Sequence, residues 1–169
     1  VTIKTRKGDT VVDADEYIRH GATLDAMEKL RPAFSKDGTV TAGNASGIND
    51  GAAALLVMTE AEASRRGLTP LARVHTVAMA GVDPIIMLTG PIPATERALR
   101  RSGLSISDIG AFEVNEAFAS VVGAWLADTG ADPTRTNING GAIALGHPLG
   151  ATGARLMITF SHQKQNRRK

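Results

Sequence analysis

The sequence of 169 residues contains no cysteine, so its own residues supply no disulfide, no thiolate metal site and no thiol nucleophile. Aromatic side chains are scarce, at 4% of the residues, and no basic run is interleaved with them. The stacking surface of a single-strand binder is therefore missing, and a net charge of +2 adds little attraction for phosphates. We expect no nucleic-acid partner.

Long hydrophobic runs are missing too. The longest, Ala52–Met58, is far shorter than the roughly 18 apolar residues of a membrane-spanning helix, and no charged-then-apolar signal sequence opens the chain. We expect a soluble, cytoplasmic protein without membrane contact. Hydrophobic residues make up 43% of the chain, enough for one sizeable core at this length.

Strand-like and helix-like segments alternate along most of the chain, which predicts an α/β fold with helices packed on a sheet. The first fifty residues differ, because they are more polar and suggest a loop-rich layer with a turn at Arg6–Asp9 and a short helix carrying Leu24, Met27 and Leu30. Strands are predicted at Ala53–Met58, Leu71–Ala80 and Ala111–Val114. One helix is predicted from the Thr59–Glu62 capping box to Gly67, and a second over Pro93–Arg101, ended by Gly103. A third is predicted from Phe118 to Gly130, with Val121, Val122 and Trp125 facing inward. A last helix begins near Thr152, with Leu156, Met157 and Phe160 facing inward.

The glycine-rich segment Asn137–Gly153 is the strongest candidate for an active-site loop. Glycine lets the backbone approach a ligand closely, and Pro148 restricts His147 to extended conformations, so the imidazole is presented at a set angle. A purely structural turn with an incidental histidine is the alternative.

Asn115 and Glu116 form a second candidate, since they follow a predicted strand at the edge where ligands collect in α/β sheets. Taken alone, Asn115 is more typical of a helix N-cap, and Glu116 of a first-turn acid that suits the helix dipole.

Two further segments carry weaker signals. The small residues of Thr41–Gly51 permit close ligand approach, or form a tight connection between layers. Arg19 lies among acidic residues and could bind phosphate, although a solvated surface role is more common. His20 and His75 have no partners at metal-ligand spacing, and we interpret both as structural.

Several of these motifs occur together in the order typical of one family, the thiolases, which the chain resembles from Val1 to about Phe160, and most closely the biosynthetic acetoacetyl-coenzyme A (CoA) thiolases. The resemblance implies a layered αβαβα fold, of which this chain would form a part, with a mixed sheet and helices on both faces. It also implies a homo-oligomer, a dimer or tetramer in full-length form. The motifs are Thr41–Gly51, Gly81–Pro84, Thr89–Ala94, Asn115–Phe118 and Asn139–Gly153.

By this resemblance, residues 1–47 correspond to the end of an inserted loop domain and residues 48–69 to the last strand and helix of the first half. Residues 70–169 correspond to a C-terminal domain that stops before a Cys-x-Gly-Gly motif. The family uses a nucleophilic cysteine, expected before Val1, and an acid–base cysteine, expected after Lys169. We therefore expect this chain alone to be inactive.

The resemblance assigns roles to several residues. His147 corresponds to the histidine that activates the nucleophile and binds the thioester oxygen, and Asn115 to the asparagine that holds a water in the same oxyanion hole. Arg19 corresponds to a residue near the adenine and phosphate end of CoA, and Ser46 to one that binds the pantetheine arm, while Ala26 replaces a frequent serine. Tunnel walls are assigned to Ala33, Phe34, Ala42, Ala117 and Phe118.

The implied activity is acetyl-CoA C-acetyltransfer, the condensation of two acetyl-CoA molecules to acetoacetyl-CoA and its reversal by thiolysis, with the CoA thioester as substrate and no cofactor or metal. Alternatives are a degradative 3-ketoacyl-CoA thiolase, a non-enzymatic remnant that binds CoA or another subunit, and, on fold grounds, a β-ketoacyl synthase. The tail Ser161–Lys169 departs from the family because it has no apolar face.

Overall fold

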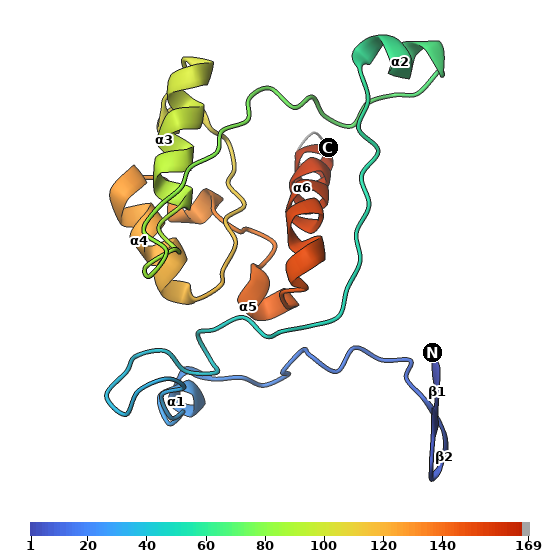
Figure 1. The fold of residues 1–169 in the computed structure, drawn as a ribbon, viewed down its shortest axis with the longest axis vertical. Coiled ribbons are helices and arrows are strands. Elements are labelled where there is room, and N and C mark those ends of the chain that lie inside the picture. Colours follow the sequence, from blue (N-terminus) through green and yellow to red (C-terminus); the bar gives the residue numbers. More distant parts are fainter. Residues whose placement is uncertain (167–169) are drawn as a thin grey trace.

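The computed structural model describes residues 1–166 (Figure 1). The last three residues of the unusual tail, 167–169, lie outside the described residues. One hairpin and a set of helices make up the regular structure of the described residues. The hairpin consists of β1 (Thr2–Thr5) and β2 (Gly8–Val11). The helices are α1 (Leu24–Met27), α2 (Glu60–Arg65), α3 (Pro91–Ser102), α4 (Ala119–Thr129), α5 (Ala142–Leu145) and α6 (Leu149–Asn166), with short 3-10 turns η1 (Ile106–Asp108) and η2 (Pro133–Arg135).

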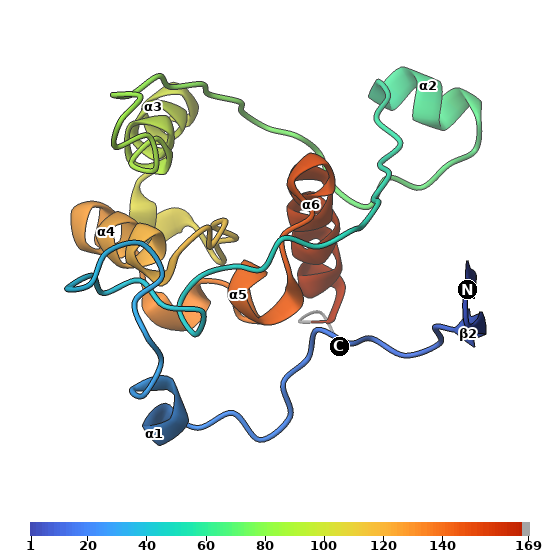
Figure 2. The same cartoon turned by 60° about the horizontal axis from the view of Figure 1, so that its bottom comes forward.

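The hairpin confirms the predicted turn at Arg6–Asp9. Its strands are antiparallel, with Thr2 opposite Val11 and Thr5 opposite Gly8, and Gly8 takes a φ of 119° that a side chain would disfavour. Both views show the hairpin on the far side of the molecule from α3 and α4 (Figures 1 and 2).

Helix ends follow the local signals in the sequence. The Thr59 hydroxyl accepts a hydrogen bond from the Glu62 backbone N–H at 3.2 Å, which caps α2, and Gly67 follows with a φ of 65°. Gly103 and Gly130 end α3 and α4 in the left-handed conformation, with φ values of 72° and 67°. These helices are confirmed, with α3 beginning two residues earlier than predicted.

The core lies between α3, α4 and the segments around them. Trp125 of α4 is 2% exposed and packs with Val114 and Ala131. Its indole N–H donates to the Thr95 hydroxyl of α3 at 2.9 Å, so the buried polar atom is satisfied. The ring of Phe112 meets Trp125 edge to face, with centroids 5.2 Å apart, and Ile92, Ile106, Val122 and Leu126 complete the cluster.

The predicted strands Ala53–Met58 and Leu71–Ala80 do not form ladders, so the expected mixed sheet with helices on both faces is not assembled from them. A strand needs a neighbour to take its backbone groups, and these segments run as isolated connections among the described residues. Arginine side chains of α3 take some of those groups instead, with Arg97 donating to the Met79 carbonyl and Arg101 to the Val77 carbonyl at 2.8 Å.

The third predicted strand, Ala111–Val114, is only partly formed. Phe112 makes an isolated parallel bridge with Thr136, in which the Phe112 N–H donates to the Arg135 carbonyl at 2.9 Å. This short pairing is nevertheless important, because it brings the residues after Val114 beside the glycine-rich loop.

Helix α6 differs from the prediction at both ends. It begins at Leu149 rather than near Thr152, and it continues through the unusual tail to Asn166. Met157 and Phe160, predicted to face inward, are 45% and 40% exposed, whereas Ala151, Thr152 and Gln163 are buried. No helix within residues 1–166 combines the length and apolar character needed to cross a membrane.

Candidate active site

His147 lies where the glycine-rich loop meets the small-residue segment Thr41–Gly51. Its backbone N–H points at two acceptors, the Gly47 carbonyl at 3.1 Å and the Asn49 side-chain oxygen at 3.2 Å, and it forms a parallel bridge with Ile48. These contacts fix the backbone of a half-buried histidine from a segment about a hundred residues away in sequence. The two segments therefore form one structural unit.

Close packing on both sides of His147 explains its glycine and proline neighbours. Gly146 has a φ of 92°, and a Cβ there would lie 2.6 Å from the Asn49 side-chain oxygen. Gly51 packs on the Pro148 ring, where a Cβ would lie 2.8 Å from Cγ. Neither glycine has room for a side chain, so the loop requires glycine at both positions.

The imidazole of His147 has one protein partner among the described residues. Its Nδ1 lies 2.8 Å from the Thr152 hydroxyl, which belongs to the first turn of α6. Nε2 is the ring nitrogen that remains for a reacting group.

Ser46 lies between the glycine-rich loop, which carries His147, and the start of α4. Its backbone N–H and its hydroxyl both donate to the Ala117 carbonyl, each at 3.1 Å. Ala45 pairs with Phe118 in an antiparallel bridge, and the Ala119 N–H donates to the Asn44 carbonyl at 2.9 Å. The structure thus brings four sequence-predicted residues together: Ser46, Ala117, Phe118 and His147.

The remaining predicted wall residues lie on the outer side of this cluster. Phe34 meets Phe118 edge to face with ring centroids 5.9 Å apart, although Phe34 remains 77% exposed. Ala33 donates its N–H to the Val40 carbonyl at 2.8 Å, and Ala42 is exposed on the same loop. Phe34 and Ala42 are thus both exposed, and Phe34 contacts the residue that follows Ala117, the partner of Ser46.

Arg19 is exposed, and no hydrogen bond or ion pair of its side chain occurs within residues 1–166. Its neighbour Tyr17 is well anchored, because the Tyr17 hydroxyl accepts from the Gly47 N–H at 2.8 Å and donates to the Ile143 carbonyl at 3.2 Å. Tyr17 therefore links the Arg19 segment to both loops of the site, a role that no local pattern in the sequence indicates.

Asn115 is not a helix N-cap, since α4 begins at Ala119 with Phe118 in the N-cap position. Glu116 likewise lies outside the first turn, and both predictions from helix capping are wrong. The side-chain oxygen of Asn115 is buried and accepts no hydrogen bond from residues 1–166. Such an atom is costly to leave unpaired, and a water or ligand donor would satisfy it.

Glu116 braces the glycine-rich loop. One carboxylate oxygen accepts from the Asn137 side-chain amide at 2.9 Å, and the other accepts from the Ile143 N–H at 3.1 Å. Asn137 also brackets Val114, accepting from its N–H at 2.8 Å and donating to its carbonyl at 2.9 Å. Asn137 has a φ of 48°, a conformation that asparagine tolerates better than most residues.

Glu113, close to the site, has a carboxyl group with a shifted pKa. Burial raises the pKa of its carboxyl above the ordinary value of 4.5, a hydrogen bond from Gln163 and the nearby Arg155 charge oppose this rise, and the Glu116 charge adds to it. Within residues 1–166, no group of three or more potential ligands forms a metal site.

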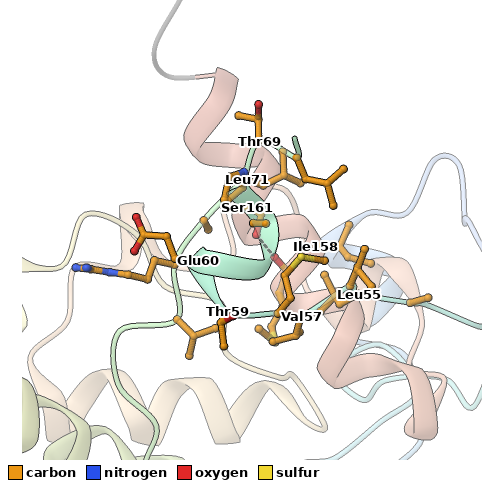
Figure 3. Close-up of a pocket in the computed structure, with 18 of the residues that line it drawn as sticks. Leu55, Val57, Thr59, Glu60, Thr69, Leu71, Ile158 and Ser161 are labelled. Atoms are coloured by element: carbon orange, nitrogen blue, oxygen red, sulfur yellow. Dashed lines mark hydrogen bonds between the residues drawn. The ribbon is translucent and has the colours of Figure 1, made fainter. Parts of the chain in front are cut away.

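An apolar groove lies away from His147, between α6 and the extended segments on either side of α2 (Figure 3). Its lining is mainly apolar and includes Leu55, Val57, Leu71 and Ile158. Because it lacks the histidine, Ser46 and Asn115, this groove is not the candidate active site.

Known proteins share both the sequence and the fold. The profile of the thiolase C-terminal domain matches residues 68–169, and that of the thiolase N-terminal domain matches residues 1–61. An acetyl-CoA acetyltransferase of Paracoccus denitrificans is 66% identical over 167 residues, which cover 99% of this chain and 43% of that protein.

Solved structures agree with the sequence relatives. The Bacillus anthracis acetyl-CoA acetyltransferase is 44% identical with a TM-score of 0.90, over 98% of this chain and 42% of that one. Human mitochondrial 3-ketoacyl-CoA thiolase in complex with CoA is 41% identical with a TM-score of 0.82, again over 98% of this chain and 42% of that one. This chain thus spans less than half the length of these relatives, with the partial α/β architecture expected, and it belongs to the thiolase family.

Proposed function

We propose that this chain supplies the histidine side of an acetyl-CoA C-acetyltransferase active site. The whole enzyme would join two acetyl-CoA molecules into acetoacetyl-CoA and run in reverse as thiolysis. The observation that carries the proposal is a set of contacts made by the small-residue segment Thr41–Gly51, which contains the residue assigned to pantetheine. This segment contacts both the glycine-rich loop that carries His147 and the residues just before α4. Ile48 and His147 are bridged, and Ser46 is bonded to Ala117.

In this proposal, His147 accepts the proton of the attacking thiol and then donates a hydrogen bond to the thioester oxygen. Asn115 holds a water that donates to the same oxygen, which fits its buried, unpaired side-chain oxygen. Donors fixed before the reaction stabilise charge that develops only in the transition state, and losing one typically lowers the rate by about 10²- to 10³-fold.

In this proposal CoA lies beside Ser46, with Phe34, Ala33, Ala42, Ala117 and Phe118 as walls and Arg19 toward the phosphates. The solved thiolase in complex with CoA supports CoA as the ligand class. On the resemblance alone, we also propose a cytoplasmic homo-oligomer, dimeric or tetrameric, without a cofactor or metal, and domain boundaries at residues 47/48 and 69/70.

The test is a graft that replaces the matched segment of the Paracoccus denitrificans enzyme with residues 1–160 of this chain. We expect the graft to retain thiolysis of acetoacetyl-CoA, and we expect His147→Ala and Asn115→Ala each to lower kcat by about 10²-fold or more. Thr129→Val, which changes α4 away from the site, is the matched control. A folded graft without activity, or one indifferent to His147→Ala, would refute the proposal.

The degradative 3-ketoacyl-CoA thiolase is the second candidate, because the human 3-ketoacyl-CoA thiolase matches almost the whole chain. Comparing kcat/KM of the graft for acetoacetyl-CoA and for longer 3-ketoacyl-CoA substrates separates the two. The chain alone, having no cysteine, should show no thiolysis, and a titration with CoA shows whether it retains binding.

A further inference from the structure

Thr152 is almost completely buried, at 4% exposure, and its hydroxyl has two neighbours. The first is Nδ1 of His147 at 2.8 Å, and the second is the Pro148 carbonyl oxygen, one helical turn back, at 3.0 Å. A hydroxyl group has one proton to donate and can accept at its lone pairs.

The carbonyl oxygen decides where that proton lies. A carbonyl oxygen only accepts, so in the hydrogen bond between these two oxygens, 3.0 Å apart, the Thr152 hydroxyl is the donor. With its proton directed to Pro148, the Thr152 oxygen can only accept from His147. With the hydroxyl in this orientation, the proton of the neutral imidazole is placed on Nδ1.

We infer that Thr152 is a positioning residue that fixes the tautomer of His147, with the proton on Nδ1 and the lone pair on Nε2. The value of this tautomer for catalysis rests on the proposed function, because Nε2 is then ready to accept a proton from a thiol. The tautomer itself is a property of this chain and is measurable without any reaction.

The ring-nitrogen chemical shifts of His147, measured by NMR on the full chain above the pH at which imidazole protonates, report the tautomer directly. We expect the Nδ1-protonated form in the unmodified chain and in Thr152→Ser, which keeps the hydroxyl. We expect its loss as the main form in Thr152→Val, which keeps the shape and removes the acceptor.

Thr129→Val is the matched control. Its hydroxyl makes the same contact to the carbonyl one turn back, Trp125, at 2.7 Å but does not touch His147, so the histidine shifts should not change. An Nε2-protonated histidine in the unmodified chain would overturn the inference, as would an unchanged tautomer in Thr152→Val. Should Thr152→Val fail to fold, the unmodified chain and Thr152→Ser still decide.

The active graft provides the second readout. There Thr152→Val should lower kcat by about 10²-fold with little change in KM, and Thr152→Ser should restore it. An inactive graft would refute the proposed function while leaving the tautomer measurement valid, so the two failures are distinguishable.

Discussion

At the scale of single residues, the site depends on backbone atoms approaching polar side chains. Gly141 is buried against Glu116, where a Cβ would lie 2.0 Å from the carboxylate carbon. The carboxylate cannot move away without losing its bonds to Asn137 and Ile143. The hydrogen bonds of Glu116 therefore require glycine at position 141.

We expect Gly141→Ala to lower the free energy of unfolding by about 1–3 kcal/mol, the usual range for overpacking a fixed site. Urea denaturation measures the change. Gly123→Ala is the control, because Gly123 lies in α4 with open space around it, and alanine there should stabilise by about 0.5–1 kcal/mol. Equal effects of the two substitutions would contradict the proposed close packing.

The buried Glu113 carboxyl makes stability depend on pH. Because burial raises its pKa in the folded state, the folded chain holds this proton more tightly than the unfolded chain. Its contribution to stability is complete below the ordinary value of 4.5 and is lost as the pH rises through the raised pKa. Glu113→Gln should therefore become progressively more stable than the unmodified chain as the pH rises.

Denaturation series from about pH 2 to pH 8 test this difference and also cover the range in which the control titrates. Asp108→Asn provides a control of opposite sign. The pKa of Asp108 is lowered by hydrogen bonds from Ser105, so its contribution is present above the ordinary value of 3.8 and is lost as the pH falls. A stability difference between Glu113→Gln and the unmodified chain that does not change with pH would show that burial does not control this carboxyl.

At the scale of elements, helices and predicted strands behave differently. The backbone groups of α4 are bonded within the helix, whereas Ala53–Met58 has no ladder among the described residues and exposes Leu56 and Val57. Amide hydrogens that lack partners exchange freely with water.

We expect hydrogen–deuterium exchange to be fast at Ala53–Met58 and slow in the middle of α4, when peptides of the full chain are compared by mass spectrometry. A dilution series is the control. Protection of Ala53–Met58 equal to that of α4 at every concentration would mean that this segment is paired within one chain, contrary to the structure.

This contrast explains which parts of the fold are predictable from sequence. Helix ends depend on residues a few positions apart, so Thr59, Gly103 and Gly130 marked them correctly. Strand formation depends on a partner elsewhere, and the apolar run Ala53–Met58 contains no information about whether that partner is present. The buried side of α6 was mispredicted for a similar reason, because Gln163 is buried by bonding to Glu113.

The site was predicted in part. The chemistry-bearing His147 was evident from its Gly-His-Pro setting, whereas the supporting residues Tyr17, Asn137 and Thr152 act through contacts that only the folded chain creates. A partial signal existed for Asn137, since asparagine tolerates positive φ better than most residues.

At the scale of the whole molecule, the described chain leaves much apolar surface uncovered. Leu55 and Val57 of the extended segment and Met157 of α6 line a groove and remain partly or largely exposed. Exposed apolar surface of this kind favours contact with further protein. The polar site around His147 lies elsewhere and is organised without that contact.

The bond between Asn49 and the His147 backbone also affects the order of folding, because it spans 98 residues. Closing a loop of that length costs about 3 kcal/mol more chain entropy than closing a helical turn, so we expect this contact to form after the helices. A partly folded population would already show the helical signal of α3, α4 and α6 but would have no assembled site. Helix content therefore overstates the fraction of competent chains, and the environment of the His147 ring is the better reporter of complete folding.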